Sequence, residues 1–301
     1  MISAHKVLML VRREIWENRS FWIAPLAIAG IILVSAAFSA TPFDSNDHAP
    51  WMVPGSGPDD IAHLKDFDKR NLIYAGVLSM LTVVQLFTLG IVVFFYLLDC
   101  LLAERKDRSI LFWKSLPISD TEVVTSKALT SLVAAPLFVL AVSAVTQILF
   151  SLIIWARFHD SVFGAMIVPW PVEAWAQVQV GFLALVPAAI LWYLPIAGYL
   201  MLVSVWSRRN AFLWAVLPWT ALQLIEALIT HTHHIADFLG RRFVGLFMIM
   251  DFEKGAREPT LGAALEHIGR VFTHYETWLG VLAAAGFLVA VIRIRRYRDE
   301  S

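Results

Sequence analysis

The chain has a single cysteine, Cys100, among its 301 residues. One cysteine excludes an internal disulfide, so no disulfide framework holds this fold together. Charged residues make up only 16% of the chain, and the two signs balance to a formal net charge of zero. No nucleic-acid partner is expected.

The motifs of several common enzymes are absent. The sequence has no Gly-x-x-x-x-Gly-Lys-Ser/Thr stretch, so it lacks a P-loop to hold the phosphates of ATP. It also lacks His-Glu-x-x-His and Gly-x-Ser-x-Gly, the patterns of common zinc and serine hydrolases. We therefore expect no catalytic residue, metal or cofactor in this chain, and any ATPase that works with it must be a separate protein.

Hydrophobic residues, in contrast, are abundant. They form 58% of the chain, and the mean hydropathy is +0.68, whereas a soluble domain is about 45–50% apolar. Six apolar stretches are long enough to cross a bilayer as helices. The sequence predicts an all-α integral membrane protein, a single transmembrane domain over residues 1–301, with spans at about 21–40, 72–98, 128–155, 178–206, 211–230 and 277–294.

The distribution of basic residues predicts the orientation of these spans. Fifteen lysines and arginines fall in the segments 1–21, 99–127, 207–210 and 293–301, and nine fall in the segments between them, 41–71, 156–177 and 231–276. Cytoplasmic loops carry an excess of lysine and arginine. We therefore expect a multi-pass protein of the cell inner (plasma) membrane with both termini in the cytoplasm.

The first 21 residues predict a basic amphipathic helix. Its apolar face is expected to carry Val7, Leu8, Val11 and Ile15, which fall at i, i+1, i+4 and i+8. A helix of this kind before a span indicates a segment that lies on the membrane surface. An ordinary basic flank is the alternative.

Residues 99–127 form a dense charged segment between two apolar runs. Its charges cannot lie in hydrocarbon, where each is unfavourable by about 2.5–3.5 kcal/mol or more. Asp107 can cap a short helix with an apolar face, and Pro117 would end that helix. Ser119 and Glu122 have the spacing of a capping box, so a new helix is predicted to start near Ser119.

The string from Glu104 to Pro117 resembles the first cytoplasmic loop of type-2 ABC exporter permeases. In that family, the loop carries a coupling helix that docks into a groove of a separate ATP-binding subunit. The resemblance implies that the partner is bound by Glu104, Arg105, Lys106, Asp107, Arg108, Ile110, Leu111 and Trp113. It also implies an interfacial elbow helix before the first span and two re-entrant outer helices between spans five and six. A solvated loop without a partner is the alternative for this segment.

As a member of that family, the chain would be the permease subunit of an ATP-driven exporter. It would pair with a second permease copy, contact membrane lipid, and depend on ATP and Mg²⁺ bound by the partner ATPase. The cargo would be an amphipathic or hydrophobic substrate. One alternative is an ATPase-linked membrane module that transmits force or a signal without transport, and another is a membrane enzyme centred on Glu226.

Polar residues inside the spans are candidates for a substrate path. We assign this role to Gln85, Gln147, Gln223 and Glu226. Glu226 is the only carboxylate well inside a span, and an intramembrane acid is a functional candidate by default. Contact with outer-loop water, or pairing with Arg241 or Arg242, is the structural alternative, and hydrogen bonding between helices is the alternative for the glutamines. His231 and His234, at i and i+3, suggest a metal site with Asp237 one turn on, but a solvated helix end is the preferred interpretation.

Overall fold

The computed structural model describes residues 4–38, 67–107, 118–158, 171–249 and 261–297, and no strand occurs in these ranges. The helices are α1 (Ala4–Glu17), α2 (Ser20–Phe38), α4 (Phe67–Asp99), α5 (Leu102–Lys106), α7 (Asp120–Leu129), η1 (Thr130–Ala134), α8 (Ala135–Phe158), α10 (Val172–Trp206), α11 (Ala211–Ile229), α12 (His234–Ile249), α14 (Leu261–Thr273) and α15 (Tyr275–Tyr297). The predicted all-helical class is confirmed for the described residues.

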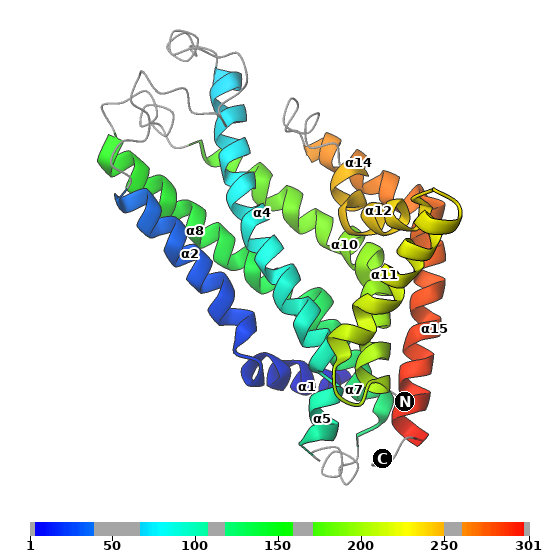
Figure 1. The fold of residues 1–301 in the computed structure, drawn as a ribbon. Coiled ribbons are helices and arrows are strands. Elements are labelled where there is room, and N and C mark those ends of the chain that lie inside the picture. Colours follow the sequence, from blue (N-terminus) through cyan, green and yellow to red (C-terminus); the bar gives the residue numbers. More distant parts are fainter. Residues whose placement is uncertain (1–3, 39–66, 108–117, 159–170, 250–260, 298–301) are drawn as a thin grey trace.

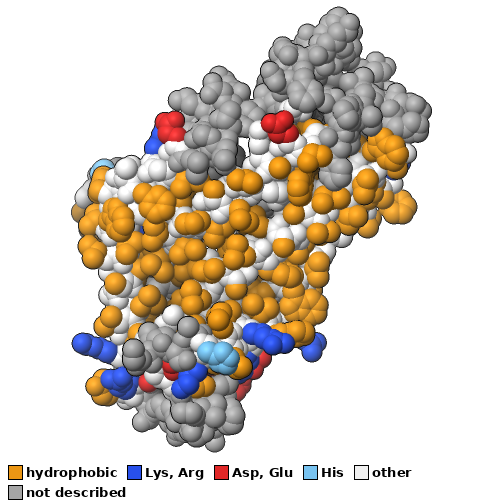
Figure 2. Space-filling model, turned by 180° about the vertical axis from the view of Figure 1, so that it is seen from behind, with side chains coloured by type: hydrophobic (Ala, Val, Ile, Leu, Met, Phe, Trp, Pro, Cys, Tyr) orange, Lys and Arg blue, Asp and Glu red, His pale blue; other side chains and the backbone are white. Residues whose placement is uncertain are grey.

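In the described part of the chain, six helical segments are long and apolar enough to cross a membrane, which supports the predicted multi-pass membrane protein. They are α2, α4, the continuous run of α7, η1 and α8, then α10, α11 and α15. Figure 2 shows the surface that follows from this composition. On the face seen there, apolar side chains cover the middle and charged side chains gather toward the two ends, as expected for a protein that exposes apolar surface to lipid.

The fourth span begins earlier than the sequence predicted. Residues 172–177 were expected in an outer loop, but they form the first turns of α10. Pro171 directly precedes this helix and Glu173 lies in its first turn, and both residue types favour a helix N-terminus. The helix then continues through Pro187 and Pro195 to Trp206, so these prolines do not divide it into two elements.

α10 is the central helix of the bundle. It packs along α15 on one side and against α4 on another, while α2 packs against α8 and α4 (Figure 1). Gly198 permits the close approach of α10 to α15, because an added Cβ would lie 3.2 Å from Cβ of Phe287 and 3.5 Å from the carbonyl oxygen of Ala284. Small residues at such crossings allow two membrane helices to pack closely.

α11 lies at the edge of the bundle and contacts α10, α12 and α4. Most of its large apolar side chains are exposed, with Leu228 and Ile229 at 69% and 73%. This face is available to lipid or to another protein. The start of α1 and the end of α15 lie at one end of the bundle, together with α5 and α7, and we call it the termini end.

α1 lies across the termini end at an angle to α2 (Figure 1). The predicted helix is present, and whether its apolar face lies on the membrane surface stays a prediction. Val7, Leu10 and Glu14 are the buried residues, whereas Leu8 is 68% exposed. The buried face of α1 therefore follows the spacing i, i+3 and i+7. It includes the carboxylate of Glu14, because this carboxylate pairs with the buried Lys127, as described below.

One turn of π-helix, η1, separates α7 from α8. The N–H of Ala135, at its end, donates to the carbonyl oxygen of Thr130, five residues earlier. Pro136 follows directly and has no N–H, so it cannot bond the carbonyl four residues before it. The wider turn therefore lies where the proline interrupts the α-helical pattern.

The two predicted short helices between spans five and six are present as α12 and α14, and their depth in a membrane stays a prediction. Arg242 of α12 is buried with its guanidinium 4.6 Å from the ring centroid of Trp192, and its Nη1 donates to the carbonyl oxygen of Glu276 at 3.3 Å. Burial lowers the pKa of Arg242 below its usual value. Gly280 leaves room for this side chain, because an added Cβ would lie 2.1 Å from Nη2 of Arg242.

A reciprocal clasp joins α5 to the end of α10. The backbone N–H groups of Leu101 and Leu102, where α4 gives way to α5, both donate to Oγ of Ser204, at 3.1 and 3.2 Å. The guanidinium of Arg105 donates to the carbonyl oxygens of Ser204 and Ser207, at 2.8 and 2.6 Å. Ser204 of α10 thus satisfies free N–H groups at the start of α5. In return, Arg105 of α5 satisfies free carbonyl oxygens at the end of α10.

The clasp predicts a large effect for a small substitution. Ser204→Ala removes the acceptor of two buried N–H groups, so we expect a loss of about 1–3 kcal/mol in the free energy of unfolding. The measurement is an SDS titration of the purified protein in mixed micelles, followed by tryptophan fluorescence. Thr220→Ala is the control, because this exposed hydroxyl bonds only carbonyls of its own helix. Equal effects of the two changes would contradict the clasp.

Candidate functional site

Five charged side chains form a buried network at the termini end. Nζ of Lys127, on α7, lies 2.7 Å from Oε1 of Glu14 on α1 and 3.0 Å from Oε1 of Glu104 on α5. Arg295, near the end of α15, pairs with the other carboxylate oxygen of Glu104 and lies 3.0 Å from Oδ1 of Asp120. The network therefore joins four helices in the order α1, α7, α5, α15 and back to α7.

The central members of this network are almost completely removed from solvent. Glu14 is 5% exposed, and Lys127 and Arg295 are each 3% exposed. Such burial is unfavourable for an isolated ion, and it is offset only where opposite charges and hydrogen bonds surround each group. Tyr96 adds a hydrogen bond, because its hydroxyl donates to Oε2 of Glu14 at 2.7 Å. Each oxygen of Glu14 thus has its own partner.

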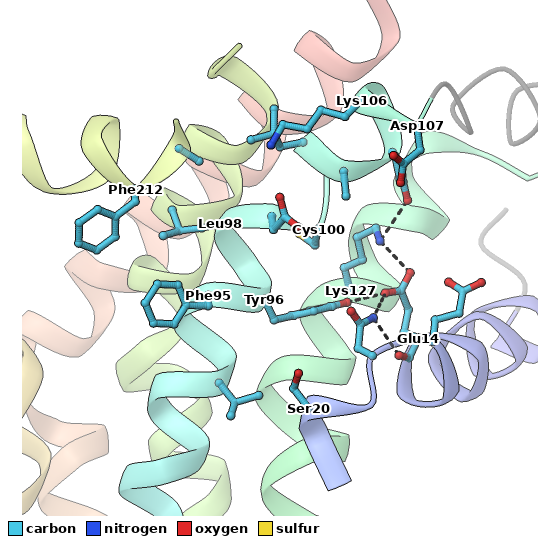
Figure 3. A pocket seen from close by; sticks show the side chains of 18 of the residues that line it. Glu14, Ser20, Phe95, Tyr96, Leu98, Cys100, Lys106, Asp107, Lys127 and Phe212 are labelled. Carbon is cyan, nitrogen blue, oxygen red and sulfur yellow. Dashed lines mark hydrogen bonds and ion pairs between the residues drawn. The ribbon is translucent and has the colours of Figure 1, made fainter. Parts of the chain in front are cut away.

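A pocket of about 950 Å³ lies beside this network. Its lining comes from α1, the start of α2, α4, α5, α7 and the start of α11. In Figure 3, Glu14 and Lys127 lie on one side of the pocket, and Phe95 and Phe212 lie on the other. The pocket therefore has one strongly polar wall and one aromatic wall.

The capping box predicted at the start of the third span is confirmed. Ser119 caps α7, with its Oγ accepting from the N–H of Glu122 at 3.2 Å, while Oε2 of Glu122 accepts from the N–H of Ser119 at 2.9 Å. This cap fixes where α7 begins. It places Asp120 in the first turn and Lys127 two turns later, so both side chains reach the network.

The predicted partner-binding residues divide into three groups. Glu104 and Arg105 make the internal contacts described above, whereas Lys106 and Asp107 are exposed at the end of α5. Asp107 is the C-cap of α5, and the helix that it was expected to begin lies outside the described residues. The remaining members, Arg108, Ile110, Leu111 and Trp113, also lie outside the described residues, and binding of a partner by any of the eight stays a prediction.

A polar seam runs between α4 and α8. Nε2 of Gln147 donates to the carbonyl oxygen of Leu78 at 2.9 Å and to Oγ1 of Thr82 at 2.7 Å. The hydroxyls of Thr82 and Ser143 bond each other at 2.8 Å, and Gln179 of α10 donates to Oε1 of Gln147. These contacts fit the expectation that glutamines hydrogen-bond between membrane helices.

Gln85 is the exception in this seam. Its side chain is completely buried, and neither its oxygen nor its nitrogen has a hydrogen-bond partner among the described residues. Gln223 lies on α11, which Figure 1 places on the other side of α4 from α8. The structure therefore does not bring the four candidate path residues together into one site.

Glu226 stabilises the connection from α11 to α12. Its Oε1 accepts from the hydroxyl of Thr232 and from the N–H of His234, both within 2.8 Å, and its Oε2 accepts from the N–H of Ile235 at 2.9 Å. Among the described residues, it forms no ion pair with Arg241 or Arg242, so the structure does not show the pairing that was one of the alternatives. The carboxylate satisfies N–H groups at the start of α12 instead, as an N-terminal cap does.

The histidine segment carries the one positive backbone φ found outside glycine in the described residues, 54° at His231. This conformation turns the chain between α11 and α12. Within the same described ranges, no group of three or more histidine, cysteine, aspartate and glutamate side chains is arranged to hold a metal ion. Cys100 is buried, and its thiol donates to the carbonyl oxygen of Leu97 at 3.3 Å.

Of the five network residues, the sequence analysis singled out only Glu104. Glu14, Asp120, Lys127 and Arg295 were assigned no role, although Glu14, Lys127 and Arg295 are buried. A signal for Glu14 was available, because it shares one helix face with Val7 and Leu10. For Lys127 and Arg295 the pairing depends on how distant helices meet, which a single sequence does not encode locally.

Comparisons with known proteins give no relative for this chain. No protein-family model matches it, and neither the curated proteins nor the solved structures include a significant match. The function of this chain is therefore inferred from its own residues and their geometry.

We predict that Lys127 is the residue on which the network most depends. Lys127→Met leaves Glu14 and Glu104 facing each other without their shared cation, so we expect a loss of about 3–5 kcal/mol in unfolding free energy. Adding Glu14→Gln should recover part of this loss, because one buried charge is removed. SDS titration measures both variants.

The matched control for Lys127 is Arg270→Gln, which breaks an exposed pair within α14 at 2.9 Å. Exposed pairs of this kind contribute about 0–1 kcal/mol. A loss for Lys127→Met as small as that of the control would show that the network does not hold the termini end together.

A second prediction compares the two buried glutamines of the α4–α8 seam. Gln147→Leu removes hydrogen bonds between three helices, and we expect a loss of about 0.6–1.7 kcal/mol. Gln85→Leu removes an amide without partners, so stability should stay the same or rise. The two variants have the same change in chemistry, and each serves as the control of the other in one SDS titration. A larger loss for Gln85→Leu would mean that its amide has a partner such as a bound water.

Proposed function

We propose that this protein is the transmembrane permease subunit of an ABC exporter, coupling ATP hydrolysis on a separate subunit to export of an amphipathic or hydrophobic substrate. The observation that carries the proposal is the attachment of both ends of the 99–127 segment to the bundle. Glu104 on one side and Lys127 on the other are joined at 3.0 Å, and the same network reaches α1 and α15. A coupling element needs such a connection, because a displaced loop must move the spans.

The proposed partner would bind the part of this segment that follows Asp107. ATP and Mg²⁺ would bind to the partner ATPase, because this chain has no P-loop. Closure of two ATPases would push the segment of each of two permease copies. Movement of Glu104 or Lys127 would be transmitted to α1 and α15, since a buried ion pair cannot be stretched without a large loss of free energy. With both termini in the cytoplasm, as the distribution of basic residues predicts, the termini end would face the cytoplasm.

The two alternatives differ in how well the geometry supports them. A module that transmits force or a signal without transport would use the same attachment, so a transport assay must separate it from an exporter. An enzyme centred on Glu226 has less support, because both oxygens of this carboxylate are occupied by the start of α12.

The partner claim predicts the effect of two apolar substitutions. Trp113→Ala combined with Leu111→Ala removes two side chains expected to fill the groove of the ATPase. Buried aromatic anchors at interfaces contribute about 2 kcal/mol or more, so recovery of the ATPase should fall at least about 30-fold. Quantitative mass spectrometry of proteins that co-purify with the chain from native membranes measures this recovery.

The matched control replaces a tryptophan elsewhere, Trp214→Ala on the exposed face of α11, and should retain the ATPase. If the wild-type chain recovers no ATP-binding protein, the proposal is wrong. If the double variant retains it fully, the docking site lies elsewhere. ATP-dependent uptake of a fluorescent amphiphile into inverted vesicles then distinguishes an exporter from a module that moves no cargo.

A further inference from the structure

The pocket at the termini end contains charges that the buried network does not use. Asp99, Lys106, Asp107 and Arg209 line it, all four are exposed, and none forms an ion pair with another described residue. Two of these groups are acidic and two are basic. The pocket therefore presents both signs of charge to a ligand, beyond the charges that Glu14, Lys127 and Glu104 compensate among themselves.

The opposite wall of the pocket is apolar and faces outward from the bundle. Phe95 of α4 is 55% exposed and Phe212 of α11 is 49% exposed, and their rings stack with centroids 6.2 Å apart and planes at 17°. Ile91 and Leu213 extend this wall and are 48% and 51% exposed. A ligand with a long apolar part could lie along these side chains while its polar end enters the pocket.

The position of the pocket matches the boundary between the apolar surface and the charged end of the molecule. Along α4 and α5 the lining extends from Ile91, within a span, to Asp107, which directly follows α5 and that span. At the start of α11 it extends from Arg209, which precedes the helix and its span, to Leu213 within them. The pocket therefore lies at the depth of lipid head groups, open to the acyl region beside it.

We propose that this pocket binds a zwitterionic phospholipid from the leaflet on the side of the chain termini. Its phosphate would lie near Lys106 and Arg209, its amine near Asp99 and Asp107, and one acyl chain would lie along Phe95 and Phe212. The volume of about 950 Å³ is at the upper end of ordinary small-molecule pockets and is large enough for a head group and the first part of a chain.

The charge pattern favours this ligand over the other common lipids. An anionic head group would gain from the two basic residues but would meet two carboxylates and no compensating cation of its own. A lipid without charge would leave all four residues hydrated and would use only the aromatic wall. A zwitterion satisfies both signs at once. The inference goes beyond the proposed function, because lipid binding needs neither an ATPase nor transport.

The test is competition between lipids on the full chain. The purified protein in nanodiscs is labelled with phosphatidylethanolamine that carries a photoactivatable group on an acyl chain, and the crosslinked peptides are mapped by mass spectrometry. Crosslinks are expected in residues 91–98 and 211–213. Unlabelled phosphatidylethanolamine should compete at least about fivefold better than phosphatidylglycerol, the factor that corresponds to about 1 kcal/mol for one charge at the membrane surface.

Variants then separate the two charged halves of the site. Asp99→Asn with Asp107→Asn should abolish the preference for phosphatidylethanolamine, and Lys106→Gln with Arg209→Gln should lower labelling by both lipids. Phe95→Ala should lower labelling at least about fivefold, since the chain contact is lost. Arg208→Gln and Phe87→Ala are matched controls, because both residues are exposed but neither lines the pocket.

Three results would overturn the proposal. They are crosslinks spread evenly over the apolar surface, equal competition by the two lipids, and equal effects of the controls and the pocket variants. All substituted side chains are exposed, so the variants are expected to fold, and the SDS midpoint of each one verifies this. Because no ATPase is present in the nanodiscs, a negative result here leaves the proposed export function untouched, and loss of ATPase binding leaves this proposal untouched.

Discussion

A lysine ammonium group between two buried carboxylates is the interaction on which the termini end depends. Lys127 contacts Glu14 and Glu104 within 3.0 Å, and Arg295 extends the series to Asp120. Every group in this series compensates a neighbour, so removing one exposes others to the full unfavourable free energy of burial. The helices at this end are therefore held by more than apolar packing, because lipid acyl chains compete for apolar contacts and not for buried ion pairs.

The helical spans could be predicted because the bilayer imposes a length and a composition on them. A stretch of about 20 apolar residues has few other uses, and all six predicted spans are present. Their ends were predicted less well. Hydropathy indicates where a helix leaves the hydrocarbon, but not where the helix itself ends. α10 begins already at Val172, because Pro171 and Glu173 favour a helix N-terminus there.

The candidate site was harder to predict, for a physical reason. The capping box at Ser119 and Glu122 is a local pattern, and the structure has it. The pairing of Lys127 with Glu14 spans 113 residues, and no local pattern distinguishes a buried lysine from one that faces the cytosol. The two glutamines illustrate the same limit, since Gln147 and Gln85 have equal chemistry, but among the described residues only Gln147 has hydrogen-bond partners on neighbouring helices.

The network also has a consequence for the order of synthesis and folding. Glu104 and Arg295 are separated by 191 residues, so the ribosome needs about 10–40 s to make the second after the first. During this interval, Glu104 and Asp120 have no arginine partner. The spans already inserted in the membrane therefore keep these carboxylates in contact with water. The termini end can therefore close only after the last helix is inserted. A chain released before residue 295 would keep its spans but would expose these carboxylates to the quality-control machinery of the cell.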